Sequence, residues 1–250
     1  MHESSKGQIY YEELFNHNGA SYHAAMKLVP NARDEEFNTA LSFVDLNAND
    51  VVLDVPAGGG YLKSYLPDNI DYHAYDFSNG FSHNNIEINK CSETSIAMPD
   101  NSVDTIFCLA AMHHIENRLG FYQEAKRILK PDGTLLIADA LVGSLQDSFL
   151  NTFVDRWNKL GHKGDFMQAE RETKELAFIG FESTSSDEEY YWKFDSLEQA
   201  RHYCRLLFAM DKNPSDNEVD VQLKLLGTKK TSSQFLMNWR LGFITAKLSA

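Results

Sequence analysis

The chain has 250 residues and a formal net charge of −13. Phosphate binding requires a basic surface, so this charge argues against DNA or RNA as the main partner. The same charge argues against an anionic membrane surface as a partner. A hydrophobic content of 43% and a charged content of 24% are ordinary for a soluble globular protein. The length is enough for one large domain with a buried core.

The cysteines and the N-terminal residues give an expectation for the cellular location of the protein. Cys91, Cys108 and Cys204 form no CxxC pair, so free thiols in a reducing compartment are expected. The first residues, MHESSKGQ, lack the apolar core of a signal peptide. No apolar run approaches the roughly 18 residues of a membrane span. The sequence therefore predicts a cytoplasmic protein without a membrane partner.

The first 47 residues are predicted to form an N-terminal helical cap. Tyr10, Tyr11, Leu14 and Phe15 recur at helical spacing, and a second apolar run follows the break at Pro30. The cap precedes the first strand of the chain.

From residue 48 to residue 140, strands and helices alternate. Strands are expected over 51–55, 71–76, 88–91, 105–109 and 134–139, and helices over 59–66, 80–87 and 116–129. This alternation is typical of βαβ units with right-handed crossovers in a parallel sheet. Residues 48–140 are therefore predicted to be the core of the domain.

After residue 140 the rhythm changes. Helices are expected over 145–160, 167–178, 196–211 and 217–226, and strands over 181–194 and 235–248. We interpret residues 141–234 as lid helices with a sixth strand, and residues 235–250 as the last strand. All of these segments are assigned to one domain, residues 1–250.

The clearest candidate binding element is the stretch Asp50–Leu62. An apolar strand breaks at Pro56 and passes through three glycines, Gly58–Gly60, into a helical segment. This geometry brings backbone N–H groups and a helix N-terminus against a ligand. Asp54 is costly to bury in such a strand unless something binds it. The alternative is that Asp54 caps its own loop.

A second acid supports a nucleotide-type ligand. Asp76 ends the second predicted strand 22 residues after Asp54, which suits a carboxylate that binds a ribose. The GxGxxG fingerprint of dinucleotide cofactors is absent, because Lys63 stands at its third glycine position. A cofactor without a pyrophosphate does not need that glycine.

Four motifs in order resemble the class I S-adenosylmethionine-dependent methyltransferases. They are LDVPAGGG, AYDFS, AMPDNSVDTIFCLAAMHHI and RILKPDGTLLIAD, and the resemblance covers roughly residues 45–140. It implies an α/β fold with a doubly wound, mostly parallel seven-stranded sheet whose last strand is antiparallel. It also implies S-adenosylmethionine as cofactor and S-adenosylhomocysteine as product.

The resemblance assigns roles to the motif residues. Asp54 and the turn would hold the methionine end of the cofactor, and Asp76 would accept hydrogen bonds from the ribose hydroxyls. Phe77 would pack on the adenine, and the adenine-contacting aspartate of the family falls on Ser92. The full predicted cofactor set is Asp54, Ala57, Gly58, Gly59, Gly60, Asp76, Phe77, Ser92, Glu93 and Ala110, with the Ala110 backbone near the sulfonium.

Methyl transfer to a hydroxyl or a carbon acid needs a base. His113 and His162 are the candidates, with an unperturbed imidazole pKa near 6.5, whereas a packing role is expected for His114. The alternatives are packing for His113 and a solvated loop position for His162. No His, Cys or Asp cluster has metal-ligand spacing in the sequence, so no metal site is predicted.

The sequence is therefore interpreted as a cytoplasmic methyltransferase that acts on a small-molecule acceptor such as a secondary metabolite. An NPPY tetrapeptide after the fourth strand would indicate nucleic-acid or glutamine methylation, and AAMH stands there instead. Two rivals stay open: a non-catalytic S-adenosylmethionine-binding protein, and a repurposed cofactor-dependent decarboxylase or cyclase. Aromatic residues in the lid frame the acceptor or form lid core: Tyr190, Tyr191, Trp192, Tyr203 and Phe208.

Overall fold

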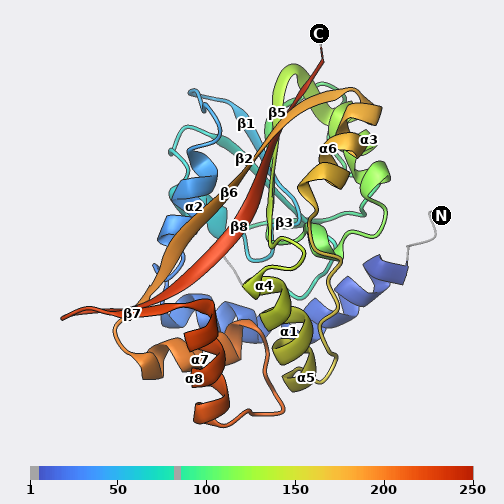
Figure 1. Cartoon of the computed structure of the whole chain (residues 1–250). Coiled ribbons are helices and arrows are strands. Elements are labelled where there is room, and N and C mark those ends of the chain that lie inside the picture. The colour runs from blue at the N-terminus through green and yellow to red at the C-terminus, as the bar shows by residue number, and fades with distance from the viewer. Residues whose placement is uncertain (1–5, 82–85, 250) are drawn as a thin grey trace.

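The computed structural model describes residues 6–81 and 86–249, and it has the predicted α/β architecture. A single twisted sheet runs through the molecule, with helices against both of its faces (Figure 1). Two long strands near one edge cross the molecule diagonally and extend beyond the rest of the sheet. The N-terminal helix α1 runs beneath the sheet, beside the C-terminal helices α7 and α8.

The sheet has the strand order β3-β2-β1-β4-β5-β8-β6. The parallel strands are β1 (Val51–Asp54), β2 (Asp71–Asp76), β3 (Ile88–Lys90), β4 (Val103–Leu109) and β5 (Leu129–Asp139). Strand β8 (Phe235–Leu248) lies antiparallel between β5 and β6 (Phe181–Phe194). The predicted fold class is confirmed, including the antiparallel last strand.

The strand number was wrong by one. A short strand, β7 (Thr228–Lys230), pairs with β8, so the sheet has eight strands and not seven. All three residues of β7 are exposed. A three-residue polar strand on an edge has no hydrophobic periodicity that could reveal it in the sequence.

The helices follow the predicted segments with shifted ends. They are α1 (Lys6–Leu28), α2 (Asp34–Leu41), α3 (Arg118–Ile128), α6 (Ala169–Ile179), α7 (Leu197–Leu207) and α8 (Asp216–Leu226). The predicted helix over 145–160 is a composite of α4 (Leu145–Ser148), a π-helical turn (Phe149–Val154) and α5 (Asp155–Trp157). The predicted helix over 59–66 is a 3₁₀ helix at Tyr61–Tyr65, and another 3₁₀ turn covers Met112–His114. The helix expected over 80–87 falls partly outside the described residues.

The late helices belong to the core and are more than loop-attached lid elements. Strands β6 and β8 continue past the other strands, and their aromatic ends give α7 a surface to pack on, with Trp192 stacked on Trp239 at a ring-centroid distance of 4.4 Å. Tyr203 of α7 is fully buried, and its hydroxyl lies 3.2 Å from Met26 of α1. One hydrophobic cluster therefore joins the N-terminal cap, the sheet and the C-terminal helices.

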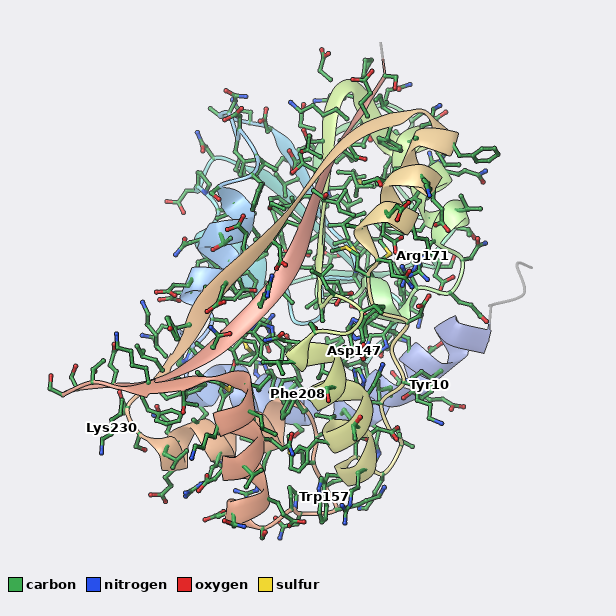
Figure 2. The ribbon with its side chains drawn as sticks, in the orientation of Figure 1. Tyr10, Asp147, Trp157, Arg171, Phe208 and Lys230 are labelled. Carbon is green, nitrogen blue, oxygen red and sulfur yellow. The ribbon has the colours of Figure 1, made fainter. Side chains whose placement is uncertain are left out.

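Figure 2 shows the two environments that this packing creates. Phe208, which follows α7, lies in the interior of the lower half of the molecule, whereas Lys230 lies outside at the tip of the long strands. None of the described helices has the length and apolar character needed to cross a membrane.

The shared core predicts that damage to α7 destabilises the whole fold. Tyr203→Ala leaves a large cavity and is expected to lower the free energy of unfolding by about 3–5 kcal/mol. Phe178→Ala is the control, because this aromatic side chain on α6 is 80% exposed, and it is expected to change stability by about 0.5 kcal/mol or less. Urea unfolding of both variants measures the difference. A Tyr203→Ala protein as stable as the parent would show that α7 is not part of the core.

Candidate functional site

Asp54 lies at the carboxyl end of β1, among buried apolar residues. Its carboxylate accepts a hydrogen bond from the Tyr72 hydroxyl at 2.7 Å, and the side chain is almost fully buried. Burial raises the pKa of Asp54 to about 7; the Tyr72 hydrogen bond opposes this shift, and the charge of Asp76 adds to it. The pKa of Asp54 in the folded state exceeds the unfolded value, which is near 3.9. Its contribution to the free energy of unfolding is therefore fully present below about pH 4 and is lost as the pH rises through 7.

Asp76 organises the glycine turn. Its carboxylate accepts the backbone N–H of Gly58 at 2.8 Å and that of Ser78 at 2.7 Å. Burial raises the pKa of Asp76 to about 7, despite these hydrogen bonds. Gly58 has a φ of +54°, in the left-handed region that favours glycine. The turn therefore depends on a buried carboxylate at the end of β2.

Tyr11 of α1 is a site residue that the sequence did not reveal. Its hydroxyl donates to Asp76 Oδ2 at 3.1 Å, and its ring meets Phe77 edge-on at 5.4 Å. In the sequence Tyr11 is one of several aromatic residues at helical spacing, which is the pattern of ordinary core. The structure places the N-terminal cap directly on the carboxylate that the resemblance assigns to the ribose.

The remaining predicted cofactor residues differ in their surroundings. The Ser92 hydroxyl oxygen is buried and has no hydrogen-bond partner among the described residues. The Glu93 carboxylate accepts the backbone N–H groups of Glu116 and Asn117 at 3.1 Å and 3.0 Å, so it also supports the start of α3. Ala110, after β4, has a φ of +51°, a strained value for a residue other than glycine.

A cavity of about 550 Å³, counting its open space, lies at these strand ends. Asp54, Ala57, Gly58 and Ala110 line it, together with Tyr11 and other aromatic side chains of α1 and of the 3₁₀ helix Tyr61–Tyr65. Gly59 and Gly60 border a separate depression beside His23 and Tyr65. The structure thus brings the first half of the turn to Asp54 and Ala110, and the second half lies elsewhere.

These residues fit an adenosyl amino acid. Two buried carboxyls suit an ammonium group and a ribose. They are Asp54, which lines the cavity, and Asp76, which accepts the backbone N–H of Gly58. The Ser92 hydroxyl lacks a partner among the residues that the structure describes, and it lines neither this cavity nor the larger one beside it. Its contact with adenine stays a prediction.

A second cavity of about 740 Å³ adjoins the first. The two cavities share five lining residues: Phe15, Tyr22, Arg33, Ala110 and His114. Arg33 is held by an ion pair with Glu36 and a hydrogen bond to the Tyr22 hydroxyl. The other walls are mainly apolar side chains from α1, the π-helical turn, α7 and β8.

The lid aromatic residues divide between this cavity and the core. Trp192 and Phe208 line the cavity, whereas Tyr190 and Tyr203 are buried core residues. Tyr191 borders a different surface depression, next to Gly227 and Asn238. Trp192 both lines the cavity and belongs to the buried core. The framing of an acceptor by these aromatics stays a prediction.

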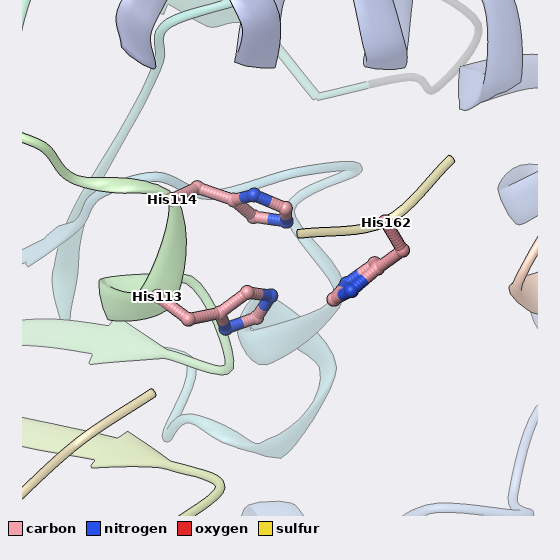
Figure 3. Close-up of side chains that lie close together, drawn as sticks. All are labelled: His113, His114 and His162. Carbon is pink, nitrogen blue, oxygen red and sulfur yellow. The ribbon is translucent and has the colours of Figure 1, made fainter. Parts of the chain in front are cut away.

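Three histidines meet in the wall of the larger cavity (Figure 3). His113 and His114 belong to the 3₁₀ turn after β4, and His162 comes from the loop after α5. The ring centroid of His113 lies 4.0 Å from that of His114 and 5.3 Å from that of His162. One ring nitrogen from each histidine lies within 4.8 Å of the others. The fold thus brings together three histidines of which one is far from the other two in the sequence, so their grouping could not be read from sequence spacing. The expectation of no metal site stays a prediction.

The two predicted base candidates differ in their partners. His113 Nδ1 lies 2.9 Å from both carboxylate oxygens of Asp139, and its backbone N–H also donates to Asp139. His162 is buried, which lowers its pKa to about 3, with a further contribution from His113. The ordinary imidazole pKa expected for His162 is therefore wrong. Burial also holds the pKa of His114 well below its usual value.

The comparisons agree with the motifs and with this geometry. Residues 53–137 match a family model described as a methyltransferase domain. The uncharacterized methyltransferase YcgJ of Bacillus subtilis is 27% identical over 141 residues, which cover 52% of this chain and 55% of YcgJ. That alignment thus spans about half the length of the curated relative.

Solved structures share the fold at low identity. The crystal structure of YcgJ superposes with a TM-score of 0.60 at 15% identity, covering 87% of this chain and 100% of YcgJ. A Haemonchus contortus phosphoethanolamine N-methyltransferase, in complex with phosphomonomethylethanolamine and S-adenosylhomocysteine, gives 0.54 at 16% identity over 86% of this chain and 53% of that one. The [4+2]-cyclase SpnF gives 0.51 at 18% identity over 87% and 82%. The chain is thus similar to S-adenosylmethionine-dependent methyltransferases in a segment that matches a methyltransferase domain, and it shares their fold.

Proposed function

We propose that the chain transfers a methyl group from S-adenosylmethionine to a small molecule bound in the larger cavity. The observation that carries this proposal is the adjacency of the two cavities, which share Ala110 and His114 among their walls. Asp54 lines one cavity, beside the glycine turn that Asp76 holds, and the walls of the other are mainly apolar and aromatic. This arrangement supports transfer across the shared wall.

The smaller cavity would hold the cofactor through the buried acids. Asp54 lines the cavity and is assigned to the ammonium of the methionine end. Asp76 is assigned to the ribose hydroxyls; it lies behind Gly58 and Tyr11, which line the cavity and donate hydrogen bonds to it. The ribose would share or replace that Tyr11 hydrogen bond. S-adenosylmethionine supplies an activated methyl group, so the chain needs chiefly to orient the acceptor and exclude water.

The larger cavity supports a small, largely apolar acceptor. Trp192, Phe208 and Trp239 form an aromatic wall, and Arg33 is already neutralised by Glu36. His113 is the group best prepared to accept a proton, because Asp139 holds its Nδ1 and leaves Nε2 as the acceptor. The assignment of His113 and His162 as catalytic residues stays a prediction.

A cyclase is the rival reaction, because SpnF has the same fold. The broad apolar cavity suits either chemistry, whereas a non-catalytic binding protein would not need it.

We also propose a cytoplasmic location without nucleic-acid or membrane partners, supported by the charge of −13 and by three buried free cysteines.

Cofactor binding should depend on pH through the buried acids. The ammonium needs an ionised Asp54, whose pKa is about 7 without ligand. S-adenosylhomocysteine is therefore expected to bind about 25-fold more tightly at pH 7.5 than at pH 5.5, in proportion to the ionised fraction of Asp54. Calorimetry at both pH values measures this ratio. Asp54→Asn should weaken binding and reduce the ratio, whereas Asp71→Asn, at the exposed start of β2, should change neither.

Asp76→Asn tests the ribose assignment. Loss of a charge-assisted hydrogen bond is expected to weaken S-adenosylhomocysteine binding by about 1.5–3 kcal/mol. Binding by Asp76→Asn that equals the parent at pH 7.5 would refute the assignment.

Transfer itself is tested with S-adenosylmethionine labelled in the methyl group and a cell metabolite extract. We expect label in a small-molecule product, and His113→Ala should slow its formation roughly a hundredfold with unchanged cofactor affinity. An unlabelled product that forms only with cofactor would favour the cyclase. Cofactor binding without any new product would favour the non-catalytic binding protein.

A further inference from the structure

The three clustered imidazoles approach the geometry of a metal centre. His113, His114 and His162 turn their rings toward one shared space (Figure 3), and one nitrogen of each lies within 4.8 Å of the others. A tetrahedral zinc ion with Zn–N distances of about 2.0–2.1 Å needs ligand nitrogens about 3.3 Å apart. Rotations of the rings that close the gap by about 1.5 Å at most would therefore seat an ion.

Two of the three histidines already have outer partners of the kind that metal ligands use. Asp139 engages His113 Nδ1 at 2.9 Å, which fixes the tautomer and leaves Nε2 for an ion. Asn151 Oδ1 lies 3.3 Å from His162 Nδ1, and it also accepts the backbone N–H of Gly164 at 2.8 Å. Metal-bound histidines characteristically donate their other N–H to a carboxylate or a carbonyl oxygen.

His114 supplies an independent observation. Its side chain is more than nine-tenths buried, and its Nδ1 has no hydrogen-bond partner among the described residues. A buried polar atom without a partner is costly and calls for an explanation. The ring lies in the wall of both cavities, so a ligand bound there would occupy the space between cofactor and acceptor.

We propose that His113, His114 and His162 bind one divalent transition-metal ion, with zinc as the expected occupant. Three imidazoles without a directly facing carboxylate suit zinc and its neighbours, whereas magnesium and calcium prefer oxygen ligands. Three protein ligands and an adjoining cavity leave the fourth position open, as in catalytic zinc sites. The ion would replace His113 as the group that activates the acceptor, since it takes Nε2.

The role of the ion rests on the proposed function, but its binding does not. A hydroxyl or thiol of the acceptor would take the fourth position and lose its proton to water more readily. The oxygen or sulfur then forms a bond to the methyl carbon while the carbon–sulfonium bond breaks. The electron pair of that bond stays on the cofactor sulfur, which becomes a neutral thioether.

Metal titration of the untagged, chelator-treated protein tests the site directly. Zinc chloride is added in a calorimeter, and cobalt chloride is added in a spectrophotometer to report tetrahedral geometry. We expect one ion per chain and the intense visible absorption of four-coordinate cobalt. His114→Ala and His162→Ala should each weaken zinc binding roughly a hundredfold or more, and Asp139→Asn about 10–100-fold.

A control variant distinguishes zinc binding at the three-histidine cluster from nonspecific zinc binding by exposed histidines. His202→Ala removes an exposed imidazole on α7 and should bind zinc like the parent. Urea unfolding of every variant serves as the check on folding. Two outcomes would overturn the proposal: no zinc binding by the parent, or zinc binding of parent strength in both His114→Ala and His162→Ala. One-to-one zinc binding without methyl transfer would keep the metal site and reject the proposed function alone.

Discussion

The hydrogen bonds of Asp139 connect the sheet to the functional site. Its carboxylate, buried at the end of β5, accepts the backbone N–H groups of His113 and Ala140 and also meets the His113 ring. These contacts tie the end of a central strand to the 3₁₀ turn after β4. The position of both neighbouring histidines, and of the wall between the cavities, depends on this one side chain. A neutral or shorter residue there would release the turn.

The same principle recurs at the other strand ends. Asp54 and Asp76 also lie buried where parallel strands finish, and burial raises the pKa of each to about 7. Their high pKa values show that burial disfavours the ionised carboxylate. A ligand that offers a positive charge or a hydroxyl group would stabilise that ionised form. The fold thus places three costly carboxylates along one edge, and each has a different set of partners. Such sites are expected where binding, and not stability, has shaped the sequence.

Much of this fold is predictable because its signals are local. The long strands β6 and β8 were predicted over the residues that form them, 181–194 and 235–248. The sequence also singled out Asp54 and the glycine turn, which the structure brings together at the smaller cavity. The histidine cluster was not predictable, because His162 reaches His113 only through the path of the loop after α5. Tyr11 was hidden among aromatic residues with the same spacing. These contacts depend on tertiary structure, which no local pattern contains.

The cap helix α1 contributes to both cavities, since Phe15 and Tyr22 line each of them. The matched domain, residues 53–137, contains most of the cofactor cavity but little of the larger one. Under the proposed function, acceptor choice would be encoded in the segments that flank the matched domain, because most residues that line the larger cavity lie there. We expect that exchanging α1, α7 and the composite helix of residues 145–157 together between relatives would exchange their acceptor specificity. Because α1 also contacts the cofactor half, such an exchange would alter cofactor release together with substrate preference.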